Sequence, residues 1–102
     1  MTVKYGLSSQ VIEQLRTAFA KYPTIEVVYL FGSRASGHFK DGSDIDLAVV
    51  APAMTESNFN SLWNEIDALP LVFKVDCIHF EKLENEALKK NILKNGVQFY
   101  HA

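Results

Sequence analysis

Two acidic residues alternate with apolar ones in the segment Asp44-Ile45-Asp46-Leu47-Ala48-Val49, which otherwise has the composition of a buried β-strand. Successive side chains of a strand point to opposite faces, so Asp44 and Asp46 leave the same face two residues apart. Burying an unpaired carboxylate is costly in free energy, because the charge loses its hydration. Any sheet that this chain forms must therefore open this face to water or supply a cation there.

A third acid, Asp76, lies in the apolar run Phe73-Lys74-Val75-Asp76-Cys77-Ile78, which also predicts a strand. If that strand lies beside the one carrying Asp46, the three carboxylates form one cluster. A divalent cation would offset their repulsion, and Mg²⁺ prefers carboxylate and phosphate oxygens. The alternative is that Asp44 caps a turn while Asp46 and Asp76 face solvent at a sheet edge. The third acid and a glycine-serine turn upstream favour the metal site.

Helical and extended patterns alternate along the whole chain. They predict an α/β (α+β) fold, with a small mixed sheet of three to four strands and helices packed mainly on one face. The short connection between the first two strands favours antiparallel pairing. In chain order we expect a helix over Ser9–Tyr22, a strand over Ile25–Phe31, a helical turn and loop over Arg34–Ser43, a strand over Asp44–Val50, a helix opened by Thr55 or Ser57 and closed by Pro70, a strand over Leu71–Phe80, a helix over Leu83–Lys94 and a short edge strand over Val97–His101.

The composition limits the classes of protein to consider. We expect a single domain, residues 1–102, because the chain is short but 48% apolar. A formal net charge of −2 argues against a general nucleic-acid binder, which needs a basic excess. The single cysteine, Cys77, excludes an internal disulfide, and we expect it to be buried on the strand face that it shares with His79. No apolar run approaches the ~20 residues of a membrane span and no signal peptide is evident, so a cytoplasmic protein is expected.

A second candidate feature is Phe31-Gly32-Ser33-Arg34, where a strand ends in glycine and serine before a short helical turn. Backbone N–H groups and a hydroxyl at such a turn can hold phosphate, and Gly32 lets the backbone approach a ligand closely. The structural alternative is an ordinary strand-to-helix turn with a serine cap. A Gly-Ser pair is common in proteins, so it indicates a phosphate site only together with the acids that follow ten residues later.

Several other side chains have both a structural and a functional interpretation. Arg34 either neutralises triphosphate charge or is a surface arginine, and both interpretations stay open. Lys74 shares a strand face with Asp76, and pairing with an acid is favoured over contact with phosphate. We expect His38 in a solvated loop and Trp63 in the core, on the apolar face of its helix.

The combined pattern resembles a known family. Gly32-Ser33-Arg34-Ala35-Ser36-Gly37, followed by Ser43-Asp44-Ile45-Asp46-Leu47-Ala48-Val49, is similar to the signature of the polymerase-beta nucleotidyltransferase superfamily, and in particular to its small prokaryotic branch, the minimal nucleotidyltransferases of the MntA-like antitoxin type. The ending Gly96-Val97-Gln98-Phe99-Tyr100 also resembles that branch. The resemblance extends from about Ile25 to Tyr100 and implies a polymerase-beta-type core.

The resemblance also implies roles for the candidate residues. Members bind a nucleoside triphosphate and two Mg²⁺ ions, and an acceptor hydroxyl attacks the α-phosphate with release of pyrophosphate. By analogy, Asp44 and Asp46 would hold the metal ions, and Asp76 would complete the metal site and take the proton of the acceptor. Gly32 and Ser33 would hold the β- and γ-phosphates.

The acceptor is expected from the same resemblance, since the chain has no room for a helical acceptor-binding domain. The minimal branch pairs with a small all-helical HEPN-type toxin, which implies an antitoxin that transfers AMP from ATP to a tyrosine of that partner. The alternatives are a small-molecule, aminoglycoside-like adenylyltransferase completed by a partner chain, and a non-catalytic antitoxin that neutralises by binding. Polymerisation onto nucleic acid is disfavoured by the near-neutral charge. Self-association through an edge strand stays open.

Overall fold

The computed structural model describes residues 3–40 and 42–102, with side chains described from Tyr5 onward. Asp41, which belongs to the predicted loop, lies outside the described residues, as do Met1 and Thr2. The elements in chain order are β1 (Val3–Lys4), β2 (Leu7–Ser8), α1 (Ser9–Ala20), β3 (Val27–Phe31), α2 (Ser33–Ser36), β4 (Ile45–Val50), α3 (Glu56–Asp67), β5 (Val75–His79), the 3₁₀ turn η1 (Phe80–Lys82), α4 (Glu86–Asn95) and β6 (Val97–His101).

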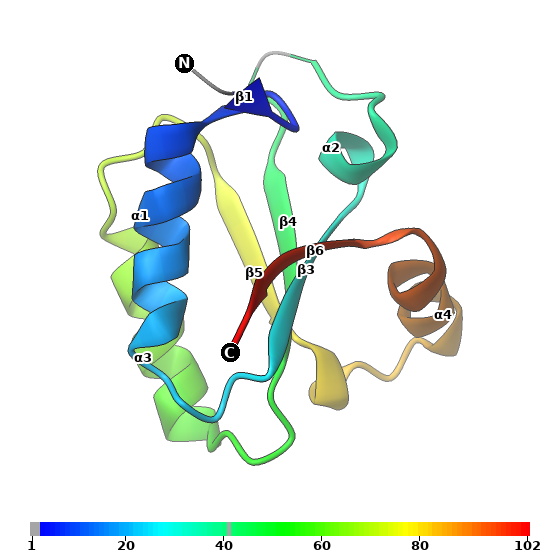
Figure 1. Cartoon of the computed structure of the whole chain (residues 1–102). Coiled ribbons are helices and arrows are strands. Elements are labelled where there is room, and N and C mark those ends of the chain that lie inside the picture. The colour runs from blue at the N-terminus through cyan, green and yellow to red at the C-terminus, as the bar shows by residue number, and fades with distance from the viewer. Residues whose placement is uncertain (1–2, 41) are drawn as a thin grey trace.

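Four strands form one mixed sheet in the order β5-β4-β3-β6, and β1 pairs with β2 in a separate small ladder. The pairs β3–β4 and β3–β6 are antiparallel, whereas β4–β5 is parallel. Figure 1 shows α1 and α3 together on one side of this sheet and α4 on the other. The predicted mixed sheet with most helical cover on one face is therefore confirmed, and the first two strands pair antiparallel as expected.

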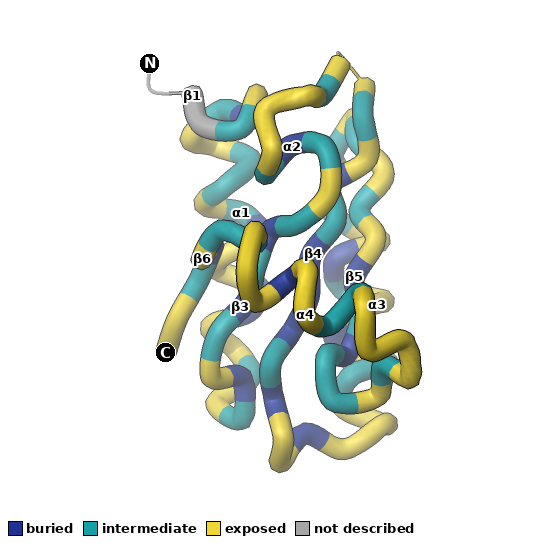
Figure 2. Tube along the Cα trace, turned by 90° about the vertical axis from the view of Figure 1, so that its right-hand side faces the viewer, coloured by how far each residue is buried: buried dark blue, intermediate teal, exposed yellow. Residues whose placement is uncertain are grey.

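The main core lies between the sheet and the α1–α3 layer. Ile45, Leu47 and Val49 alternate along β4 and are fully buried there, with Leu15 and Phe19 of α1 among their core partners. In Figure 2 the buried segments follow the middle of the sheet, while α4 lies in front of it with mostly exposed residues. Strand β4 thus anchors its apolar face in the core and leaves its opposite face for other chemistry.

Capping side chains determine where the helices begin. Ser8, Thr55 and Asn85 each accept a hydrogen bond from the backbone N–H three residues later. The last helix was predicted from Leu83, but it begins at Glu86, because Asn85 caps it and residues 80–82 form a separate 3₁₀ turn. Among the described residues, no helix is both long and apolar enough to cross a membrane.

Two further sequence expectations are corrected by the structure. The third strand begins at Val75 and not at Leu71, because the chain turns after α3 with the Leu71 N–H bonded to the Leu69 carbonyl. Trp63 is 41% exposed and so lies outside the core. The buried stripe of α3 is set by Leu62 and Ile66, and the residue after Leu62 is rotated by about 100° around the helix.

Candidate active site

The sheet brings two of the three predicted acids side by side. Asp46 is the second residue of β4 and Asp76 the second residue of β5, and the parallel register pairs them directly. Asp44 lies one residue before β4 and is exposed, as is Asp76, whereas Asp46 is partly buried. On the other side of β4, the register sets Phe31 opposite Asp46. The carboxylates therefore gather at one end of the sheet, close to where β3 leads into α2.

The environment of Asp46 disfavours its ionised form. Its pKa is raised above the ordinary value, first by burial and then by the negative charges of Asp76 and Asp44. Lys74 acts in the opposite direction. Among the described residues, no carboxylate lies within ion-pair distance of Lys74, so the expected direct pair is replaced by a longer-range effect. The acids thus form a site of unbalanced negative charge.

Replacing Asp46 by Asn is expected to stabilise the fold at neutral pH. The raised pKa of Asp46 means that its ionised form is penalised in the folded state at every pH above the folded pKa, and Asn removes that penalty. Solvent screens the partly exposed group, so we expect the midpoint of thermal unfolding to rise by about a few degrees at pH 7. The gain should vanish as the pH falls through the folded pKa to below about 4, where Asp46 is protonated in both states. An equal gain at pH 3 and pH 7 would contradict this electrostatic origin.

The three acids have the donor chemistry that a magnesium site requires. Hard oxygen ligands concentrated at one edge favour Mg²⁺, and a bound cation would relieve the repulsion that raises the pKa of Asp46. Among the described residues, no three His, Cys, Asp or Glu side chains already lie close enough together to hold a metal ion. Asp44 and Asp76 are exposed, and Asp76 is the register partner of Asp46, so a metal ion bound here would require these side chains to turn toward Asp46.

Gly32 connects β3 to α2 and lies directly against the acids. Its φ of 79° is in the region that glycine favours, and a Cβ added there would lie 2.6 Å from Oδ2 of Asp46. Any larger residue would collide with the carboxylate. Ser33 follows as the first residue of α2 and is partly buried. The glycine-serine turn and the acids are thus parts of the same local structure, as the sequence pattern predicted.

Arg34 is buried and binds the protein's own backbone. Its Nε and Nη2 donate to the Ser43 carbonyl oxygen at 3.1 and 2.8 Å, and Nη1 donates to the Tyr5 carbonyl at 2.9 Å. The guanidinium also lies over the rings of Phe39 and Phe73. Arg34 is therefore not a surface arginine. These contacts favour a structural role, in which it ties the loop before β4 to the N-terminal turn.

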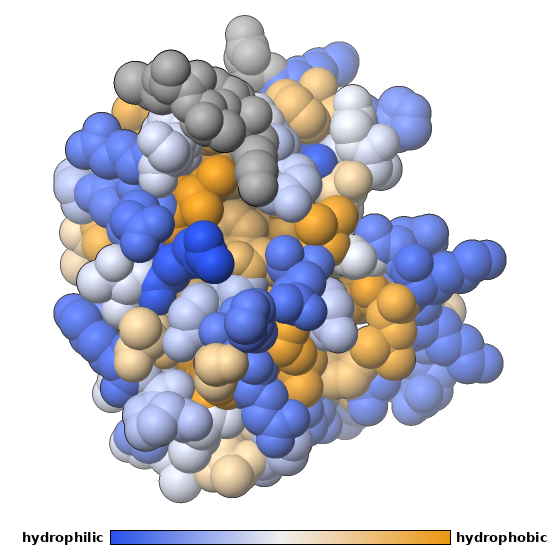
Figure 3. Space-filling model, viewed as in Figure 1, coloured by the Kyte–Doolittle hydropathy of each residue, from blue (hydrophilic) through white to orange (hydrophobic). Residues whose placement is uncertain are grey.

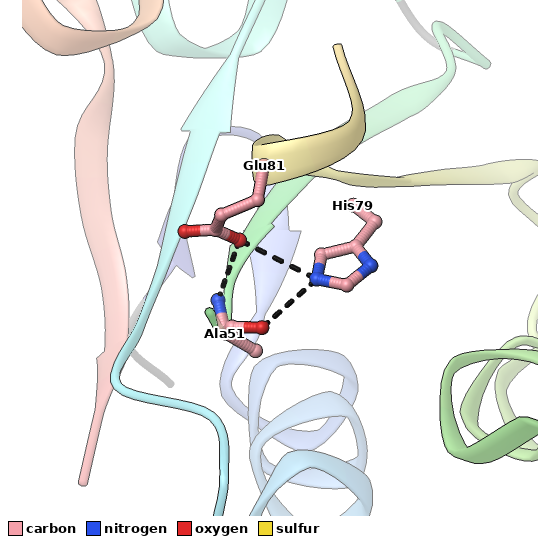
Figure 4. Close-up of polar contacts among 3 residues, drawn as sticks. All are labelled: Ala51, His79 and Glu81. Carbon is pink, nitrogen blue, oxygen red and sulfur yellow. Dashed lines mark hydrogen bonds and ion pairs between the residues drawn. The ribbon is translucent and has the colours of Figure 1, made fainter. Parts of the chain in front are cut away.

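The far end of β4 holds a separate polar cluster, shown in Figure 4. His79 is buried and its Nε2 donates to the Ala51 carbonyl at 2.9 Å, while a carboxylate oxygen of Glu81 accepts from the Ala51 N–H at 2.9 Å. Ala51 lies five residues beyond Asp46, roughly 16 Å along an extended strand. This cluster therefore fixes the end of the sheet and lies away from the acids. Glu81 was not singled out from the sequence.

The two remaining residues considered in the sequence, Cys77 and His38, lie in environments that indicate no catalytic role. Cys77 is buried, as expected, and burial raises the pKa of its thiol to about 12, with a smaller effect from Asp76. The thiol is therefore protonated at neutral pH and is not a nucleophile. His38 is exposed, with Nδ1 3.2 Å from the Ser36 hydroxyl, which agrees with the expected solvated loop.

A cavity of about 500 Å³ opens between α2 and α4, next to the glycine-serine turn. Its lining consists of Phe31, Gly32, Ala35, Ser36, Asn91 and Asn95. Sequence reasoning assigned Asn91 and Asn95 no role. The only sequence signal for them is that two asparagines stand one helical turn apart in a helix, where asparagine is not favoured.

Comparison with known protein families identifies the family of this chain. Residues 13–102 match the family described as polymerase beta, nucleotidyltransferase. The chain belongs to this family. A comparison with curated proteins finds no match. The match confirms the resemblance to the polymerase-beta nucleotidyltransferase superfamily that the sequence pattern indicated.

Solved structures of similar fold include toxin–antitoxin complexes. A toxin–antitoxin with AMP-PNP shares 22% identity at a TM-score of 0.72, covering 89% of this chain and 73% of that one. The MntA-HepT complex shares 20% identity at a TM-score of 0.68, covering 93% and 74%. A complex of tri-AMPylated Shewanella oneidensis HEPN toxin with MNT antitoxin shares 23% identity at a TM-score of 0.60, covering 91% and 68%. At these identities the similarity shows the fold alone.

Proposed function

We propose that this nucleotidyltransferase transfers AMP from ATP, with Mg²⁺, to a tyrosine of a HEPN-type toxin, and thereby acts as an antitoxin in the cytoplasm. The observation that carries the chemistry is the register of β4 and β5, which sets Asp46 beside Asp76 and against Gly32. The choice of partner is supported by the similar folds, one with AMP-PNP and one from a complex with an AMPylated HEPN toxin.

The proposed reaction is an in-line displacement at the α-phosphate. The acceptor oxygen forms a bond to the α-phosphorus, the bond from that phosphorus to the oxygen bridging to the β-phosphate breaks, and pyrophosphate leaves with the bonding electrons. We assign the acceptor's proton to a carboxylate oxygen of Asp76, which is exposed next to the half-buried Asp46. Because the reaction transfers a charged group, most of the protein's contribution is positioning and charge neutralisation.

Three carboxylates would hold Mg²⁺ in this site: Asp44, Asp46 and Asp76. When bound, two such ions would neutralise the triphosphate and stabilise charge on the attacking and leaving oxygens. Asp46 is the most buried of the three, while Asp44 and Asp76 are exposed. Gly32 and Ser33 are proposed to contact the phosphates, since a glycine at position 32 allows the backbone of this turn to lie directly against the Asp46 carboxylate. Arg34 is not included, because its guanidinium binds backbone carbonyls.

The experiment uses ATP labelled at either the α- or the γ-phosphate. The purified chain is incubated with Mg²⁺, labelled ATP and a lysate of its host, and labelled protein is resolved on a denaturing gel and identified by mass. We expect label on a HEPN-type protein from the α-position only, and AMP on a tyrosine in the digested band. Label from the γ-position would contradict nucleotidyl transfer.

Two other outcomes would redirect the assignment. Pyrophosphate release with label on a small molecule, and none on protein, would favour the small-molecule adenylyltransferase. Protection of cells from the toxin without any label transfer, retained when Asp44 and Asp46 are both Asn, would favour a binding antitoxin.

A further inference from the structure

The cavity between α2 and α4 is not used by the metal site, yet it begins beside it. Gly32 belongs to the cavity lining, and the position of its missing Cβ is 2.6 Å from the Asp46 carboxylate. In Figure 3 this region is the indentation at the right-hand edge of the molecule, between the parts formed by α2 and α4. The cavity therefore begins at the turn whose backbone lies directly against the Asp46 carboxylate.

The α4 wall of this cavity offers hydrogen-bond donors. Asn91 and Asn95 are four residues apart on α4, so their carboxamides lie one above the other on the same face. Both are exposed, and neither side chain hydrogen-bonds to another of the described residues. Each carboxamide carries two N–H donors. The pair is thus free to bind a ligand that accepts hydrogen bonds from one side.

The opposite wall fits a slender, polar ligand better than a flat ring. It is formed by the small residues Gly32, Ala35 and Ser36 of the turn and α2, and Phe31 is the only aromatic residue in the lining. Extended apolar or aromatic walls favour the binding of a nucleobase, whereas phosphate binding requires hydrogen-bond donors and positive charge. Lys94 lies three residues after Asn91, on the neighbouring part of the same helix surface, and is exposed. Its charge offsets the negative end of the α4 dipole at this point.

We propose that this cavity holds the terminal phosphates of the nucleoside triphosphate, and that Asn91 and Asn95 donate hydrogen bonds to their oxygens. This inference rests on the proposed function and extends it. The pair would make the protein select nucleoside triphosphates over monophosphates, and it would hold the departing pyrophosphate on the side of Gly32 away from the acceptor. Asn91 and Asn95 are thus binding residues for the leaving group and take no part in the proton transfer.

The test compares three probes in the presence of Mg²⁺: AMP-PNP, AMP and inorganic pyrophosphate. Calorimetry measures AMP-PNP and AMP directly, and pyrophosphate is measured by its competition with AMP-PNP. For the variant Asn91→Ala/Asn95→Ala we expect the affinities for AMP-PNP and pyrophosphate to fall by about tenfold or more, because two charge-assisted hydrogen bonds are lost. The affinity for AMP should stay within about twofold of wild type. Alanine favours helix, so the variant should fold, which circular dichroism checks.

Asn64→Ala provides the matched control. Asn64 is an exposed asparagine of α3, which lies on the other side of the sheet, so its removal should change none of the three affinities. An equal loss of AMP and AMP-PNP affinity in the double variant would assign the cavity to the nucleoside and overturn the proposal. Unchanged affinity for all three probes would overturn it as well. If the wild-type protein bound neither AMP-PNP nor AMP, the proposed function itself would be wrong. That result differs from the one that overturns only this inference, in which the wild type binds AMP-PNP and the double variant binds it equally well.

Discussion

Changing Asp44 and Asp46 together to Asn is expected to lower the rate of nucleotidyl transfer by about a thousandfold or more while the protein stays folded. Each carboxylate would help to hold the metal ions that neutralise charge at the reacting phosphate. Losing one such electrostatic contribution costs a factor of roughly 10² to 10³ in rate, and the two carboxylates act on the same ions. The folded state should survive, because Asp44 is exposed and ionised Asp46 is penalised where it lies. The measurement is pyrophosphate release with ATP, Mg²⁺ and the acceptor, together with the midpoint of thermal unfolding.

A matched control separates this effect from a general change in charge. Asp67 is an exposed aspartate at the end of α3, and Asp67→Asn removes one negative charge from a helix that does not belong to the β4–β5 pair. We expect it to retain wild-type activity. If the double variant kept more than about a tenth of the wild-type rate, the assignment of these acids as metal ligands would be wrong. A large loss of thermal stability in the double variant would instead show that the acids support the fold.

The second large effect is expected for Arg34→Ala, and it is an effect on stability. Arg34 is only 3% exposed, and its guanidinium serves two backbone carbonyls. Truncation leaves both carbonyls without this donor and removes the stacking on Phe39 and Phe73. With a cost of about 1–3 kcal/mol for each orphaned group, we expect a loss of roughly 3 kcal/mol in the free energy of unfolding. That corresponds to a fall of about 10 °C or more in the unfolding midpoint.

Two further variants define what Arg34 does. Arg34→Lys keeps the positive charge but cannot donate through a planar fork, so its stability should fall between those of wild type and Arg34→Ala. Arg16→Ala removes an exposed arginine of α1 and should leave the unfolding midpoint within about two degrees of wild type. An Arg34→Ala protein with normal stability but weakened AMP-PNP binding would return Arg34 to the phosphate site. Denaturant unfolding and calorimetry distinguish the two outcomes.

Some residue placements in the site could be predicted from the sequence, and others could not. That Asp44 and Asp46 share a face follows from the two-residue period of a strand, and a sheet opening at these acids follows from the cost of burying charge. The pairing of Asp76 with Asp46 could only be stated as a condition, because it depends on which strands become neighbours and in what register. The role of Arg34 could not be predicted from the sequence for a similar reason, because one of its two carbonyl partners is Tyr5, which lies 29 residues away.

Local patterns in the sequence predict the four strands of the main sheet, the long helices, the acid-bearing strand, the glycine-serine turn and the family, but not the small β1–β2 ladder or the 3₁₀ turn η1. Which residues from separate elements meet depends on the packing of the whole chain. That packing brought Asn91 and Asn95 of α4 to the cavity beside Gly32, and it left Trp63 on the surface although its helix has an apolar face. Periodicity places a side chain on a face of its own helix or strand. Whether another element covers that face depends on long-range packing, which no local window of sequence contains.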